Sequence, residues 1–194
     1  CDLAIPVLKR LETDAEYPQN TTFAQANLMK CYYEKHDFAN SEIYADKVLK
    51  NPKMDDKIKS DAQIIIARSA IKTNNDAKAK EAYAKLQKIA KGELAAEALY
   101  YEAYFKNKEG KFDASNKVVE KYSSTYSGYK YFGAKSLVLM AKNYYGLKDS
   151  FQATEILQSI IDNFTEFPDV VTESQTELDR IKAEEAKTNS SISK

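Results

Sequence analysis

A two-helix pattern repeats along this chain of 194 residues. Small residues recur at intervals of 37, 38, 35 and 39 residues, and each is followed four positions later by another apolar or small residue. The small residues are Ala4, Ser41, Ala79, Ala114 and Ala153. A period of this length is typical of arrays of stacked helical hairpins. It therefore predicts an all-α fold of a kind that usually serves as a binding scaffold.

Start and stop signals for helices divide the array into units. Apolar residues within each unit are spaced three, four and seven apart, which is the period of a helix and not of a strand. We expect a solenoid over 1–187 that consists of a half-repeat at 1–17, repeats at about 21–52, 55–91, 93–127 and 129–165, and a capping helix at 168–187. Thr22 to Gln25 resembles a capping box that opens a helix. Residues 188–194 are small and polar, which predicts a disordered tail.

Charge and hydropathy exclude several classes of partner. The chain has 29 basic and 29 acidic residues, so its balanced charge gives no general attraction to nucleic acid or to an anionic membrane. No stretch approaches the roughly 20 apolar residues that a membrane span requires. We therefore predict neither a nucleic-acid partner nor a transmembrane segment.

The two cysteines, Cys1 and Cys31, leave alternatives open. Cys1 could be the lipid-modified first residue of a mature lipoprotein, but helical periodicity starts at once and the repeat begins in mid-unit, which favours a chain cut from something larger. Cys31 falls in an apolar helix and is expected to be an inert buried thiol. A disulfide between the two cysteines requires that the first two helices bring them close.

Residues that could perform chemistry are scarce. The single histidine, His36, falls in a predicted turn, where an exposed turn residue is the simplest interpretation. One histidine and two separated cysteines cannot form a standard zinc site, and no glycine-rich phosphate loop is present. Tyr129 to Phe132 combines aromatic and basic residues, which could mimic a base-stacking surface but is better explained as packing at a helix entry. We expect a protein that is not an enzyme and uses no cofactor or metal.

Several units resemble the tetratricopeptide repeat. The residues that carry the resemblance are Leu28, Met29, Tyr32, Phe38, Ser41, Ala45, Val48 and Pro52 in one unit, Ile66, Ala67, Ala79, Tyr83 and Leu86 in the next, and Leu137, Ala141, Tyr144, Ala153, Leu157 and Ile160 in the last. The unit between them departs from the pattern, since Glu102 stands where the first small residue usually lies. The resemblance covers nearly the whole chain. It implies a right-handed α-α superhelix that acts as a non-catalytic protein-protein interaction scaffold.

Within that family, the exits Tyr17-Pro18, Tyr126-Ser127 and Phe167-Pro168 look like those of bacterial cell-envelope members. Those members include lipoproteins of outer-membrane assembly and a protein associated with the Tol–Pal system. The resemblance thus suggests a periplasmic or envelope location. Two alternative roles follow from it: an architectural spacer within a long envelope protein, or a lipid-anchored assembly subunit.

The resemblance also predicts where a partner binds, because the first helix of each tetratricopeptide unit lines a groove for a peptide or a partner helix. Carried over by register, the groove residues are Phe23, Lys30, Tyr33, Ile64, Arg68, Ile71, Lys72, Leu99, Lys106, Lys135, Val138, Lys142 and Tyr145. One positive residue per unit forms a ladder (Lys30, Arg68, Lys106 and Lys142), which would favour an acidic peptide. The alternative is that these cations are ordinary solvated surface.

Overall fold

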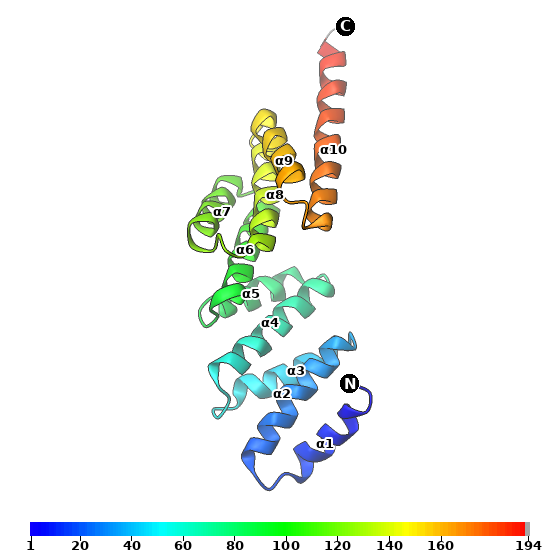
Figure 1. Cartoon of the computed structure of the whole chain (residues 1–194), viewed down its shortest axis with the longest axis vertical. Helices are drawn as coiled ribbons and strands as arrows, with labels where there is room; N and C mark the ends of the chain where they lie inside the picture. The colour runs from blue at the N-terminus through cyan, green and yellow to red at the C-terminus, as the bar shows by residue number, and fades with distance from the viewer. Residues whose placement is uncertain (193–194) are drawn as a thin grey trace. The chain divides into compact units, whose positions relative to one another are not determined.

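The structure is a computed structural model that describes the backbone of residues 1–192 and the side chains of residues 1–187 (Figure 1). Those residues form helices joined by short turns, and they contain no strand. The helices are α1 (Ala4–Asp14), α2 (Pro18–Glu34), α3 (Phe38–Lys50), α4 (Asp56–Lys72), α5 (Asp76–Leu86), α6 (Gly92–Lys108), α7 (Phe112–Thr125), α8 (Lys130–Gly146), α9 (Ser150–Asn163) and α10 (Pro168–Ile192). The predicted all-α array of antiparallel helix pairs is confirmed.

Four helical hairpins share one turn design. They are α2–α3, α4–α5, α6–α7 and α8–α9, and in each the first helix has 17 residues. Each turn contains one residue with positive φ: His36, Asn74, Gly110 and Lys148. In three turns the residue directly after the positive-φ residue caps the second helix, as when Asp37 accepts a hydrogen bond from the backbone N–H of Asn40. The residue with positive φ ends the first helix, and the N-cap residue after it starts the second, so the chain reverses direction within a few residues.

The hairpins also share one crossing point, where a buried residue of the first helix faces a small residue twelve positions later. The crossing pairs are Met29 with Ser41, Ala67 with Ala79, Ala103 with Ser115, and Ala141 with Ala153, and each of these residues is at most 1% exposed. The hydroxyls of Ser41 and Ser115 donate to the carbonyls of Met29 and Ala103, both at 2.9 Å. Ser115 therefore takes the place that the sequence analysis gave to Ala114, which is only half-buried.

The chain divides into two compact units, residues 1–98 and residues 99–194, and the boundary falls within α6. In the first unit α1 packs against α2, α2 packs against α3 and α4, and α3 and α5 each pack against α4. In the second unit α8 packs against α7, α9 and α10. The second unit has a core made by α8, α9 and α10, which includes Ala141, Leu157, Ile160, Val170 and Ile181.

The structure differs from the sequence analysis at the start of α2 and at the end of α10. α2 begins at Pro18, so Thr22 lies inside the helix and bonds to the carbonyl of Gln19 instead of capping. Proline suits the first turn because its missing N–H has no helical partner there. α10 continues past residue 187 to Ile192, since extending an existing helix orders only one residue per added hydrogen bond. Residues 193 and 194 of the predicted tail lie outside the described residues.

The cysteines are joined, which corrects the expectation of a buried free thiol at Cys31. Cys1 and Cys31 form a disulfide across α1 and α2, with their Cα atoms 5.2 Å apart. The pairing depends on how closely the two helices approach, which spacing in the sequence does not reveal. In the part of the chain that the structure describes, no helix is both long enough and apolar enough to span a membrane.

Candidate partner-binding surface

The first helices of the hairpins carry the residues predicted to line a groove. Three of these residues are buried in the helical core: Ile64, Leu99 and Val138. Phe23, Lys30 and Lys72 are exposed, and the remaining residues are half-buried, namely Tyr33, Arg68, Ile71, Lys106, Lys135, Lys142 and Tyr145. The buried three cannot touch a partner unless the helices separate, because close packing leaves them no open face.

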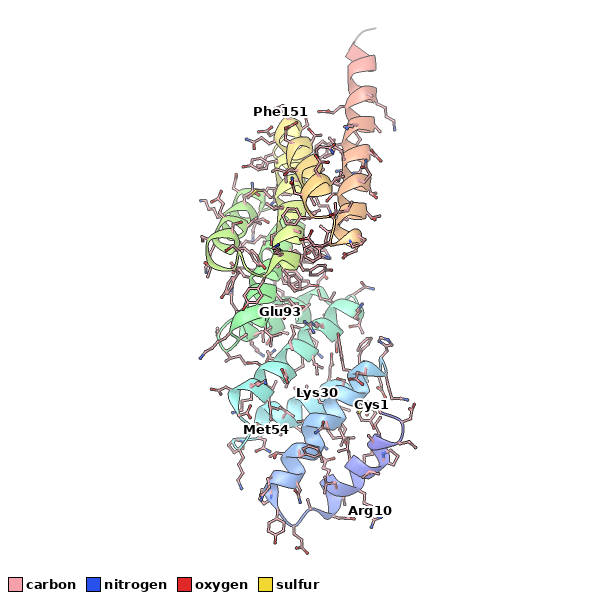
Figure 2. The ribbon with its side chains drawn as sticks, viewed as in Figure 1. Cys1, Arg10, Lys30, Met54, Glu93 and Phe151 are labelled. Atoms are coloured by element: carbon pink, nitrogen blue, oxygen red, sulfur yellow. A yellow bond between two sulfur atoms is a disulfide. The ribbon has the colours of Figure 1, made fainter. Side chains whose placement is uncertain are left out.

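Every cation of the predicted ladder has a carboxylate partner. Lys30 in α2, labelled in Figure 2, lies 2.8 Å from Asp61 in α4. Lys142 in α8 lies 2.5 Å from Glu173 in α10. The sequence separation of both pairs is 31 residues, close to one repeat, so a cation on one first helix meets an acid on the next. These two cations of the ladder therefore form ion pairs between neighbouring repeats.

Arg68 makes the tightest of these pairs. Its Nε and Nη2 atoms donate to the two carboxylate oxygens of Glu97 at 2.9 and 2.5 Å. Glu97 is 2% exposed and also accepts a hydrogen bond from the hydroxyl of Tyr83 at 2.9 Å. The hydrogen bonds that Arg68 donates to the Glu97 carboxylate raise the pKa of Arg68 above its ordinary value. A buried carboxylate needs such partners, since an unpaired one is costly to remove from water.

Lys106 departs from this pattern. It lies 3.5 Å from Glu102, four residues earlier on its own helix, and not from an acid on α8. The residues at the corresponding separation on α8 are Lys135, Ser136 and Leu137, and none of them carries a carboxylate that could pair with a lysine. The repeat-to-repeat ion pair is thus replaced here by a contact within one helix. The helices α6 and α8 are instead joined by the ring contact of Tyr100 with Phe132 and by a hydrogen bond that the Asn107 amide donates to Asn143 at 2.7 Å.

These aromatic residues form what we call the aromatic surface: Tyr100, Tyr101 and Tyr104 of α6, Tyr131 and Phe132 of α8, and Phe167 just before α10. The ring of Phe132 lies 5.4 Å from that of Tyr100, and the ring of Tyr131 lies 5.4 Å from that of Phe167. Contacts at this range between tilted rings are favourable beyond the area that they bury. The run from Tyr129 to Phe132 thus packs a helix entry against neighbouring elements, as the packing interpretation predicted.

Charged groups surround the aromatic surface. The Lys135 ammonium lies 5.8 Å from the ring centre of Tyr100 and 5.7 Å from that of Tyr131. The Tyr131 hydroxyl donates to Asp169 at 2.8 Å, and burial together with this bond raises the pKa of Tyr131 to about 12. Burial likewise raises the pKa of Tyr100. These two phenols therefore stay neutral, and the surface offers rings beside two cations, Lys135 and Lys108, and the carboxylate of Asp169.

Sequence reasoning identified Lys135 and Lys142 but missed most of the aromatic surface. The signal that could have found it is the spacing of Tyr100, Tyr101, Tyr104 and Phe105, since residues three and four apart share one face of a helix. Glu97 was also missed. An acid in the middle of an alanine-rich helix looks like a solvent-facing residue until its neighbours are known.

His36 occupies a turn with positive φ and its ring lies 5.9 Å from that of Phe38. Among the described residues, no group of three or more His, Cys, Asp or Glu side chains could hold a metal ion.

Two of the hairpins, α4–α5 and α8–α9, match a known family of repeats. A family model matches residues 61–90, which cover most of α4 and all of α5, and residues 135–166, which cover most of α8 and all of α9. Both segments match the tetratricopeptide repeat. Each of the two compact units thus contains one matched repeat, and the predicted resemblance is confirmed at these two places. No curated protein matches the chain. Tetratricopeptide repeats generally mediate protein-protein interaction and are generally non-catalytic.

Proposed function

We propose that this chain is a non-catalytic scaffold that binds a peptide or helix of a partner protein, and that the aromatic surface is the anchor of that contact. The observation that carries the proposal is the accessible edge of this surface. Tyr131 remains 37% exposed although its ring packs on Phe132 and Phe167. Rigid aromatic rings contribute much contact area at a small cost in conformational entropy, which is why they dominate the binding energy of many interfaces.

The chemistry of the partner follows from the groups beside the rings. An acidic segment, as the cation ladder suggested, would have to compete with Asp61, Glu97 and Glu173 for their cations. An apolar or proline-containing segment needs no such exchange, because it can lie on ring faces that are already arranged. We therefore favour a partner segment with apolar side chains at its centre, flanked by one charge of each sign to meet Lys135 and Asp169.

Selection from a displayed peptide library on the full chain tests this function. Peptides selected on the native chain should bind the Tyr131→Ala variant about tenfold or more weakly, as expected for an anchor residue. Phe151→Ala is the matched control, because Phe151, labelled in Figure 2, is 74% exposed but lies at the start of α9, just after the end of α8 that is opposite to Tyr131. Peptides that bind Tyr131→Ala as tightly as the native chain, or that depend on Phe151, would contradict the proposal.

The disulfide supports an oxidising compartment, such as the bacterial periplasm or cell envelope. Disulfides persist in secreted and periplasmic proteins and are rare where glutathione and thioredoxin keep thiols reduced. A lipid anchor on Cys1 requires the same sulfur atom that bonds to Cys31, so the anchored-subunit role and the disulfide exclude each other. Mass analysis of the natural protein under non-reducing conditions distinguishes them, since a disulfide removes two hydrogens and a lipid adds a large mass.

A further inference from the structure

The rings of the aromatic surface form a continuous row that runs from α6 across α8 to the start of α10. The centres of successive rings lie 5.2 to 6.4 Å apart, in the order Tyr104, Tyr100, Phe132, Tyr131 and Phe167. Tyr131 stands at 73° to Phe132 and at 76° to Phe167. Rings in this nearly perpendicular arrangement leave notches between a face and an edge, whereas stacked rings would form a flat wall. The row therefore fits an extended segment with small apolar groups.

The carboxylates beside this row already hold donors from the chain itself. Asp169 accepts a hydrogen bond from the Tyr131 hydroxyl at 2.8 Å. Glu173 accepts one from the Lys142 ammonium at 2.5 Å. A ligand that brings additional N–H groups would have to share these acceptors.

The open polar groups of the surface are donors. In the part of the chain that the structure describes, the hydroxyls of Tyr100 and Tyr104 form no hydrogen bond, and the Lys135 ammonium has no carboxylate partner. Tyr100 is only 6% exposed, and burial raises the pKa of Tyr100 well above its ordinary value, so the hydroxyl keeps its proton. A tyrosine buried to this extent usually has a hydrogen-bond partner. Its open O–H therefore points to an acceptor that a ligand supplies.

These donors limit the backbone conformation that a ligand can have. The carbonyls of an α-helix are bonded within the helix and are not free to accept. A β-strand offers carbonyls, but its N–H groups would face a surface whose open groups are themselves donors. A polyproline II segment has no internal hydrogen bonds, so its carbonyls are free, and proline carries no N–H. Of the three, only the proline-rich segment matches both the donors and the notches.

We propose that the aromatic surface binds a proline-rich segment of a partner protein in the polyproline II conformation. Its pyrrolidine rings lie in the notches beside Tyr131, and its carbonyls accept hydrogen bonds from Tyr100 and Tyr104. This inference rests on the proposed function, because it names the class of segment that the same surface takes. A preformed polyproline II helix loses little entropy when it docks on aromatic side chains. The described residues contain no such segment, since no two of the four prolines are neighbours, so the ligand comes from outside them.

The peptide library that tests the proposed function also tests this inference. Peptides selected on the native chain, after removal of those that bind Tyr131→Ala, should be enriched in proline over the unselected library. A selected peptide, synthesised with a fluorescent label, should show the circular dichroism of polyproline II when free and bind saturably in anisotropy titrations. Replacing its prolines by alanine should weaken binding about tenfold or more, because alanine restores N–H groups and loosens the free peptide.

Two hydroxyl deletions separate the donors from the rings. Tyr100→Phe and Tyr104→Phe should each weaken the selected peptide about three- to tenfold, as expected for one lost hydrogen bond. Neither variant should lower Tm, because neither hydroxyl forms a hydrogen bond within the described part of the chain. Tyr126→Phe is the matched control, because Tyr126 is also half-buried among tyrosine rings but lies outside the aromatic surface.

The outcomes distinguish this inference from the proposed function. Selected peptides that depend on Tyr131 but are helical or lack proline would overturn the inference and leave the proposed function standing. A library that yields no peptide dependent on Tyr131 would overturn both. The inference also fails if proline-rich peptides bind Tyr100→Phe and Tyr104→Phe as tightly as they bind the native chain.

Discussion

The guanidinium of Arg68 donates a hydrogen bond to each carboxylate oxygen of Glu97 and so joins the first helix of one hairpin to the first helix of the next. Lys30 with Asp61 and Lys142 with Glu173 repeat the arrangement at about the same separation in the sequence. Only Glu97 is almost completely buried, and only Arg68 offers two parallel donors. The pair therefore contributes specificity of register as well as attraction, since a planar guanidinium fits a carboxylate in few orientations.

Removal of the guanidinium should destabilise the protein. Arg68→Met leaves Glu97 buried with the hydrogen bond from the Tyr83 hydroxyl but without its cation, and we expect a loss of about 1–3 kcal/mol in the free energy of unfolding. This loss is smaller than that for a fully buried ion pair, because the Arg68 side chain is 43% exposed and partly screened by water. Urea unfolding measures the loss in free energy. The double variant Arg68→Met with Glu97→Met should recover part of the loss, and a double variant worse than the sum of the single ones would refute this account.

Leucine at a crossing point should force two helices apart. Ala79→Leu and Ala141→Leu each add three carbon atoms where no surface is exposed, which costs about 1–3 kcal/mol by overpacking. For a chain of this size each kcal/mol lowers Tm by about 2–4 °C. Ala183→Leu on the exposed side of α10 is the control and should leave Tm nearly unchanged. Unaltered thermal unfolding of both core variants would show that the crossing register is wrong.

Reduction of the disulfide should weaken the first unit. The bond between Cys1 and Cys31 closes a loop over a separation of 30 residues, and the chain-entropy model assigns such a loop about 3–4 kcal/mol. Reductant should therefore lower Tm and speed hydrogen exchange in α1. The Cys31→Ser variant should show the lower Tm from the outset and no response to reductant. If reductant changed the native chain and the variant equally, the effect would have another source.

Alkaline pH should destabilise the fold by ionising phenols whose pKa is raised in the folded protein. Burial and the carboxylate of Glu12 raise the pKa of Tyr44 to about 12, and Tyr131 has a similar value beside Asp169. Because the folded-state pKa exceeds the ordinary value near 10, the stabilisation is complete below about pH 10 and is lost as pH rises towards 12.

Tyrosinate absorbance follows this titration without interference from tryptophan, which the chain lacks. Urea midpoints at about pH 9 and pH 11 give the loss of stability. Tyr44→Phe should reduce the difference between the two midpoints, since phenylalanine cannot ionise. An equal difference in the variant would assign the alkaline loss to other groups.

The aromatic surface illustrates what could have been predicted and what could not. The periodicity of Tyr100, Tyr104 and Phe105 is visible in the sequence and places them on one side of a helix. Which of them remain accessible depends on Phe132 and Phe167, residues that approach from other elements. The groove prediction failed for the same reason at Leu99 and Val138, which have the right register but lie within the core.

The sequence by itself determined the helical hairpins, their number and their order, because those features depend on local spacing, on turn residues such as Asn74 and Gly110, and on small residues at crossing points. Only the tertiary structure decided which charges are paired, which cysteines are joined and which apolar residues stay in water. These properties depend on atoms some 30 residues apart meeting within a few ångströms. A shift of one position in a helix turns a side chain by about 100° and changes its neighbours. For this reason Ser115 lies at the crossing point, whereas Ala114, the residue before it, does not.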